Sequence, residues 1–222
     1  MGIPMRKFFL STLALASTVM IAVAAQAGVQ PAITFDNTTG QTLGNPPFTL
    51  GWSFSTNSAV TVSSLGVFDS GLDGLANSYQ VGIFNSGGTL LTSTTVQSGT
   101  VDPLINQFRY ASTAPVTLAA GGTYSIGALY LTGSDGLVAA PGGFGIPVNF
   151  AVNSAITFLD AEYAFGSSLT APQNGAGGEG YFGPNFLAGG VPELSTWAMM
   201  IIGFGGVALQ IRRRTGAIAT TA

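Results

Sequence analysis

Histidine and cysteine are absent from the 222-residue sequence, and the only lysine, Lys7, lies near the N-terminus. The chain beyond that point therefore has no Ser-His, Cys-His or Ser-Lys nucleophile pair and no lysine for a Schiff base. Metal binding through imidazole or thiolate is excluded for the same reason. Because the most common catalytic groups are missing, we expect that the protein is not an enzyme.

Charge is also scarce, since only 7% of the residues are charged against about 25% in typical domains. Arg109 is the only cation between positions 8 and 211, and residues 28–190 carry one cation and eight acids, a net charge of −7. Nucleic acids need cations that neutralise their phosphates, so they are excluded as partners of this region. Anionic lipid surfaces are disfavoured as well.

Apolar and turn-forming residues are abundant. Hydrophobic residues make up 46% of the chain, and glycine accounts for 32 positions. This composition is typical of a weakly charged, turn-rich, all-β extracellular protein, and the length suits one domain of about 150 residues plus processing segments.

Residues 1–27 have the pattern of a signal peptide. A basic pair at positions 6 and 7 precedes an apolar run over 8–24, and Ala25-Gln26-Ala27 forms an A-x-A exit. Signal peptidase is expected to cut after Ala27, so we predict that the protein is exported. The alternative is a retained N-terminal anchor.

Short strand-like runs recur between turn clusters in the body of the chain. We expect strands at 50–55, 59–68, 79–96 (a hairpin turning at 85–88), 107–112, 114–131, 148–152 and 155–159. No helical periodicity is evident between Pro31 and Gly189. The spacing predicts an antiparallel β-sandwich, jelly-roll-like or immunoglobulin-like, over residues 28–132, with remaining strands, Gly- and Pro-rich loops and a tether over 133–190.

Candidate sites in the body are few. Asp69 and Asp73 in "DSGLDG" suggest a calcium ligand pair, although Asp-Gly is also a common turn former. Asp160 and Glu162 should share one strand face about 7 Å apart, which allows paired-carboxylate glycoside chemistry or two solvent-facing acids.

Five further side chains in the body have two interpretations each. Arg109 is expected either to form an internal ion pair or to be a solvated strand residue. Aromatic residues stack on sugars when exposed but lie more often in the core, and the candidates here are Trp52, Phe54, Tyr79 and Phe84.

Three segments of the body carry a family resemblance. The runs "VSSLGVFDSGLDGLANSYQVGIFNSGGTLLTSTTV", "FRYAS" and "PVTLAAGGTYSIGA" resemble an uncharacterised β-sandwich family of bacterial secreted and surface proteins. In that family an LG-hydrophobic-(Y/F)-D strand precedes an acidic glycine loop, a VGI(W/F) strand and a PVTL turn. The resemblance covers residues 35–131 and implies a surface or adhesive module without a known reaction.

Near the C-terminus lies an uncharged run, residues 194–211. Eighteen helical residues extend about 27 Å, close to the hydrocarbon thickness of about 30 Å. Trp197 at one end and Arg212 to Arg214 at the other would place the body outside the cell. We predict a transmembrane helix over 195–211 with a cytoplasmic tail over 216–222; the alternative is a buried core helix.

This C-terminal stretch, residues 191–215, resembles the PEP-CTERM sorting signal, which is also labelled an ice-binding protein C-terminal domain. The matching positions are Pro192 and Glu193, the block Trp197, Ala198, Met199 and Met200, the glycines Gly203 and Gly205 flanking Phe204, and the cluster Arg212, Arg213 and Arg214. Leu194 stands where the family usually has its second proline.

The resemblance implies that the protein is the substrate of an exosortase, a membrane cysteine transpeptidase of Gram-negative bacteria that make exopolysaccharide. The chain would be anchored transiently in the inner membrane, cut near Pro192-Glu193, and moved to the cell surface or extracellular matrix. An alternative function is a secreted carbohydrate- or ice-binding module, suggested by the Ser/Thr-rich run "TLLTSTTV". A glycoside hydrolase that uses Asp160 and Glu162 is a third.

Overall fold

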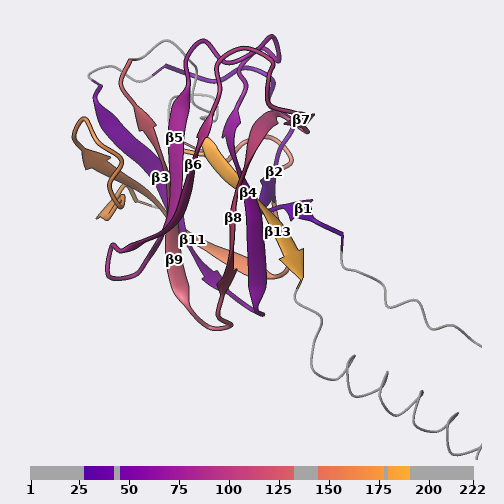
Figure 1. Cartoon of the computed structure of the whole chain (residues 1–222), viewed down its shortest axis with the longest axis vertical. Helices are drawn as coiled ribbons and strands as arrows, with labels where there is room; N and C mark the ends of the chain where they lie inside the picture. The colour runs from indigo at the N-terminus through magenta and orange to yellow at the C-terminus, as the bar shows by residue number, and fades with distance from the viewer. Residues whose placement is uncertain (1–27, 43–45, 133–144, 178–179, 191–222) are drawn as a thin grey trace, which may run out of the picture. The chain divides into compact units, whose positions relative to one another are not determined.

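A computed structural model of the chain describes residues 28–42, 46–132, 145–177 and 180–190 (Figure 1). Their regular elements are β-strands, and the paired strands are antiparallel. The predicted all-β class is therefore confirmed for this part of the chain, where no helix is long and apolar enough to cross a membrane. The predicted signal peptide and the helix at 195–211 lie outside the described residues.

The strands fall into two large sheets and one small one. Their bounds are β1 Gln30–Pro31, β2 Ile33–Thr34, β3 Phe48–Thr56, β4 Val60–Phe68, β5 Tyr79–Asn85, β6 Leu90–Val96, β7 Leu104–Ile105, β8 Phe108–Leu118, β9 Thr123–Tyr130, β10 Ala151–Val152, β11 Ile156–Phe165, β12 Asn174–Gly175 and β13 Pro184–Gly190. One sheet has the order β1-β13-β4-β8-β7, the other the order β12-β11-β3-β9-β5-β6, and β10 pairs with β2.

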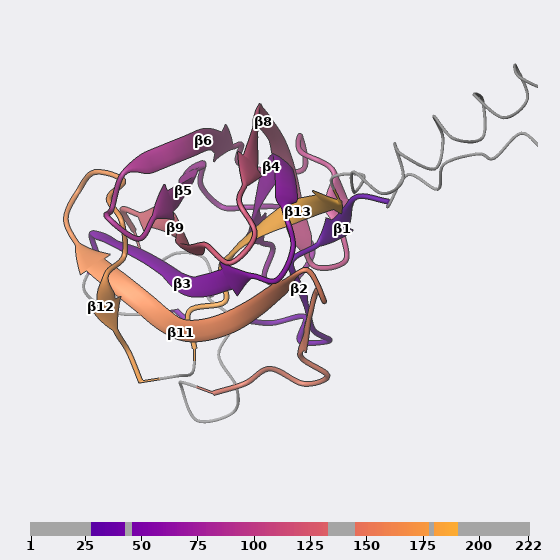
Figure 2. The same ribbon diagram turned by 90° about the horizontal axis from the view of Figure 1, so that it is seen from below.

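The two large sheets enclose a common apolar core in a sandwich-like arrangement (Figures 1 and 2). Alternate residues of β3 point inward, and Trp52 and Phe54 contact Phe186 of β13 across the core at ring-centroid distances of 5.9 and 5.0 Å. The Trp52 Nε1–H also donates to the Pro184 carbonyl oxygen at 2.9 Å. Burial of these large aromatic side chains from both sheets, together with the aliphatic residues of the core, supplies hydrophobic driving force for folding.

Asn185 ties the N-terminal segment to the five-stranded sheet. Its fully buried amide accepts a hydrogen bond from the Ile33 N–H at 3.2 Å and donates one to the Ile33 carbonyl at 2.8 Å. Nearby, the Phe35 ring packs against Phe68 and Phe108 at 5.5 and 5.1 Å. Residues 32–35 therefore form part of the folded body.

A row of glycines marks the outer face of the six-stranded sheet. Gly51, Gly127 and Gly82 lie opposite one another on β3, β9 and β5. A Cβ at Gly127 would lie 3.0 Å from the Pro172 ring, and a Cβ at Gly82 would lie 3.1 Å from Leu169. The absence of side chains along this row lets the loop at 166–173 pack directly against the sheet.

Two expectations about strands are wrong. The segment 114–131 contains the end of β8 and the whole of β9, because the chain turns at Gly121, which has a φ of 74°. The expected tether is also interrupted: residues 184–190 form β13, which lies between β1 and β4. The Phe186 side chain in the core and the Asn185 amide hydrogen bonds hold this strand despite its small residues.

Candidate functional site

Asp69 and Arg109 form a buried ion pair in the sandwich-like body. The Arg109 Nε–H donates to Asp69 Oδ2 at 2.7 Å, and its Nη1 donates to the Asp102 carbonyl oxygen at 3.1 Å. The Gly74 N–H approaches both Asp69 carboxylate oxygens, at 3.1 and 3.2 Å. The prediction of an internal ion pair at Arg109 is therefore confirmed.

This pairing defines the surroundings of the proposed calcium ligands. The Asp69 backbone carbonyl accepts from the Leu72 N–H at 3.2 Å, and Leu72 has a φ of 62°, as expected for a tight turn. A guanidinium occupies the place beside Asp69 where a calcium site would need further oxygen ligands. Within the described residues, Asp69 and Asp73 are not joined by a third acidic side chain that would complete a metal site.

Asp160 and Glu162 lie on the same outer face of β11, as their spacing predicts, since their cross-strand partners are Ser53 and Gly51. Burial raises the pKa of the half-buried Glu162 carboxyl, and the charge of Asp160 raises it further, whereas a hydrogen bond from Ser53 lowers it. The pair thus contains one carboxyl that takes up a proton more readily than an exposed glutamate.

The aromatic residues singled out as possible sugar-stacking groups all lie inside the body. Each is at most 2% exposed, so the core interpretation is confirmed for Trp52, Phe54, Tyr79 and Phe84.

Three other rings form a surface aromatic cluster: Tyr163, Phe165 and Tyr181. Tyr163 lies between the other two, with centroid distances of 5.3 Å to Phe165 and 6.3 Å to Tyr181. Phe165 is 74% exposed. Sequence spacing does not reveal this cluster, because Tyr181 is distant in sequence from the two residues of β11.

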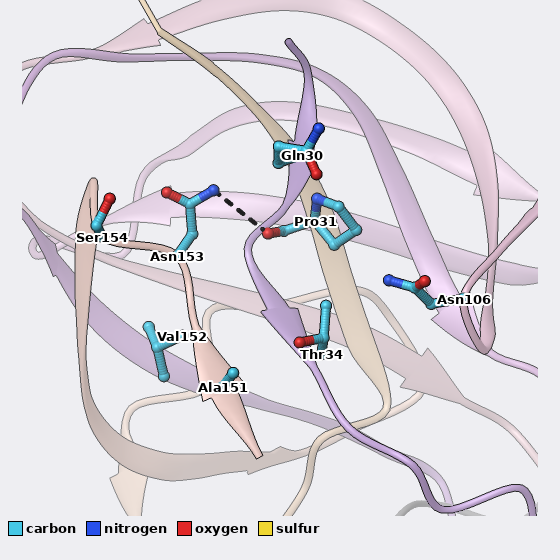
Figure 3. Close-up of a pocket in the computed structure, with 8 residues that line it drawn as sticks. All are labelled: Gln30, Pro31, Thr34, Asn106, Ala151, Val152, Asn153 and Ser154. Carbon is cyan, nitrogen blue, oxygen red and sulfur yellow. Dashed lines mark hydrogen bonds between the residues drawn. The ribbon is translucent and has the colours of Figure 1, made fainter. Parts of the chain in front are cut away.

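A shallow pocket of about 280 Å³ opens where three chain segments meet (Figure 3). It is lined by Gln30, Pro31, Thr34, Asn106, Ala151, Val152, Asn153 and Ser154. None of these side chains is ionisable, so the lining is electrically neutral. No local sequence pattern predicts this pocket, because its residues come together only through the pairing of β1 with β13 and of β2 with β10.

The polar side chains of the pocket differ in what they bind. The Asn153 amide donates to the Pro31 carbonyl oxygen at 3.5 Å and accepts from the Ala155 N–H at 3.0 Å, so it braces the wall (Figure 3). In contrast, the side chains of Gln30, Thr34 and Asn106 make no hydrogen bond with another described residue. Their donors and acceptors are free to bind a polar molecule in the pocket.

The predicted processing residues cannot be placed in this geometry, because Ala25, Ala27 and the sorting signal over 191–215 lie outside the described residues. Comparisons with protein-family models, with curated proteins and with solved structures found no match for this chain. Function is therefore inferred from the residues and their arrangement.

Proposed function

We propose that this protein is an exported, non-catalytic protein of the cell surface or extracellular matrix, with a β-sandwich body of jelly-roll or immunoglobulin-like type. Its C-terminal segment acts as a sorting signal that an exosortase cleaves. The observation that carries the proposal is the pair of sequence patterns outside the body: a signal-peptide pattern that ends at Ala27, and a PEP-CTERM-like tail from Pro192 to Arg214.

The first and last described strands of the body pair with each other. β1 pairs with β13, with Gln30 opposite Ala188 and Pro31 opposite Leu187, while β13 pairs along its other edge with β4. A body whose first and last described strands pair with each other suits a protein that is processed at both ends at the membrane and then acts elsewhere.

The two terminal segments of the chain indicate how the protein is exported and anchored. The signal peptide directs export through signal peptidase, and the Trp197 to Arg214 segment has the length and flanks of a transient inner-membrane anchor. The resemblance to the PEP-CTERM motif links this route to exosortase and to exopolysaccharide in a Gram-negative cell. The acidic, lysine-free body suits an extracellular location rather than binding to nucleic acid.

Surface fractionation tests this function. An epitope tag inserted after Ala27 stays on the body after both cuts. We expect the tagged body in the surface or released fraction of an exosortase-positive strain, and in the inner-membrane fraction when the exosortase gene is deleted. A matched variant that lacks residues 191–222 should be released in both strains. An identical distribution of the full chain in the two strains would contradict the proposal.

A second candidate function is a secreted carbohydrate- or ice-binding module. The neutral pocket with its free amide and hydroxyl groups favours a carbohydrate ligand. The Ser/Thr-rich run gives less support to ice binding, because Thr92 is buried and its hydroxyl contacts the Thr113 hydroxyl at 2.7 Å. Thermal hysteresis measurements separate the two ligands, and we expect no hysteresis above that of a control protein.

A further inference from the structure

We propose that the pocket of Figure 3 binds one neutral sugar unit of a glycan. This inference rests on the second proposed function, the carbohydrate-binding module, and is independent of sorting. It names the binding site and the chemical class of the ligand.

The pocket presents polar groups of the type that sugars need. Gln30 and Asn106 carry amides and Thr34 carries a hydroxyl, so each of the three can donate and accept hydrogen bonds. Sugar hydroxyl groups also do both. Because these protein groups have no hydrogen-bond partner among the described residues, a ligand would not have to break an existing bond within the body.

An apolar surface accompanies these groups. The Pro31 ring lies between Asn153 and Asn106, with Thr34 below it in this view, and Ala151 and Val152 add aliphatic surface (Figure 3). A sugar ring has the same two-sided character, with polar hydroxyls at its rim and C–H groups on its faces. Small-molecule sites combine apolar surface with placed polar groups; here polar residues form the larger share of the lining, which suits a hydroxyl-rich ligand.

Part of the site is held in place before a ligand arrives. The Asn153 side chain joins the Pro31 carbonyl to the Ala155 N–H, which fixes one wall. Asn106, between β7 and β8, has a φ of 54°, a left-handed conformation that asparagine tolerates better than most residues. A wall and a turn that are already ordered reduce the entropy lost on binding.

Charge and size narrow the ligand class. The only cation among the described residues is Arg109, which is buried against Asp69, so acidic sugars would find no accessible counter-charge. The eight lining residues include no carboxylate, which gives a cationic ligand no partner either. The volume of about 280 Å³ lies just below the usual range of ligand pockets, about 300–1,000 Å³, and suits a ligand no larger than a single sugar unit.

NMR titration of the ¹⁵N-labelled full-length chain, in a detergent without a sugar headgroup, tests the site. The probes are glucose, galactose, mannose, rhamnose and N-acetylglucosamine, with glucuronate as a charged counter-probe. We expect at least one neutral sugar to shift the side-chain amide signals of Gln30 and Asn106, whereas glucuronate leaves them unchanged.

Variants locate the binding. Asn106→Gly removes the amide but keeps the left-handed backbone accessible, and Thr34→Val removes the hydroxyl at nearly constant shape. The double variant should bind the sugar about tenfold more weakly, as expected for two lost hydrogen bonds. Gln80→Ala, on the exposed part of β5, is the matched polar control, and Phe165→Ala tests the surface aromatic cluster as a competing site. Both should bind as the wild type does.

Two results would overturn the inference and can be told apart. If none of the five neutral sugars shifts the wild-type spectrum, both the pocket site and the carbohydrate-binding function fail, while sorting is unaffected. If sugar binds but the double variant retains full affinity, or Phe165→Ala abolishes binding, the function stands and the assigned site is wrong.

Discussion

Arg109 Nε lies 2.7 Å from Asp69 Oδ2 in the interior of the body, where both side chains are almost completely buried. This contact joins β8 to the turn that follows β4. A charge removed from water is stabilised only by such a partner, so the two residues depend on each other.

Breaking this ion pair should destabilise the protein strongly. Asp69→Asn leaves the Arg109 charge buried without its counter-charge, which costs about 3–5 kcal/mol in comparable cases. Urea unfolding should show this as a lower midpoint. In the double variant Asp69→Asn/Arg109→Met, part of the loss should be recovered because no charge remains. A loss below about 1 kcal/mol for Asp69→Asn would contradict a structural role for the pair.

Calcium should not affect stability. The Asp69 carboxylate is engaged by Arg109 and the Gly74 N–H, so a cation would have to compete with a guanidinium. We expect the same melting temperature in excess Ca²⁺ and in EGTA. A rise in melting temperature with Ca²⁺ that Asp73→Asn removes would instead support the calcium interpretation of this loop.

Glu162 should make stability depend on pH in a defined direction. Burial raises its pKa in the folded state above the ordinary glutamate value, so the folded protein binds the proton more tightly than the unfolded chain. Stability contributed by this group is then highest at acidic pH and falls as pH rises through the folded-state pKa. Glu162→Gln should therefore raise the melting temperature at pH 7 but have little effect at pH 3.5.

A control variant distinguishes the effect of Glu162 burial on the melting temperature from the effect of removing any acidic charge. Asp102→Asn changes an acid outside β11, and its effect should not follow the pH profile of Glu162→Gln. If Glu162→Gln lowers the melting temperature at pH 7, the surroundings stabilise the carboxylate, and burial does not dominate its pKa.

Asn185 should control how firmly the N-terminal segment is attached. Asn185→Leu removes both hydrogen bonds to Ile33 and leaves the Ile33 N–H and carbonyl without partners, at a cost of about 1–3 kcal/mol each. Hydrogen exchange at residues 31–35 should accelerate more than in the core strands. Ser78→Ala, which removes exposed hydrogen bonds to Gln97 and Ser98 near β5 and β6, is the control and should leave residues 31–35 unchanged.

Local patterns in the sequence were sufficient to predict the hairpin at 79–96. Alternation marks β5 and β6, and the Asn85 side chain accepts from the Gly87 and Thr89 N–H groups to form the turn. These signals act over a few residues, so they can be recognised without knowing the rest of the fold.

Long-range pairing could not be predicted in this way. β13 is rich in glycine and other small residues, so its sequence does not predict a strand. Its pairing with β4 holds it in place, with Phe186 opposite Leu65 and Ala188 opposite Val62. The pocket could not be predicted from the sequence either, because Thr34 and Asn106 are far apart along the chain and line the same pocket only after the sheets form.

Mass spectrometry of the C-terminus in cells with and without the exosortase tests the proposed sorting most directly. We predict a chain that ends near Pro192-Glu193 when the exosortase is present and one that retains Arg212 to Arg214 when it is absent. An intact tail in both strains would contradict exosortase sorting.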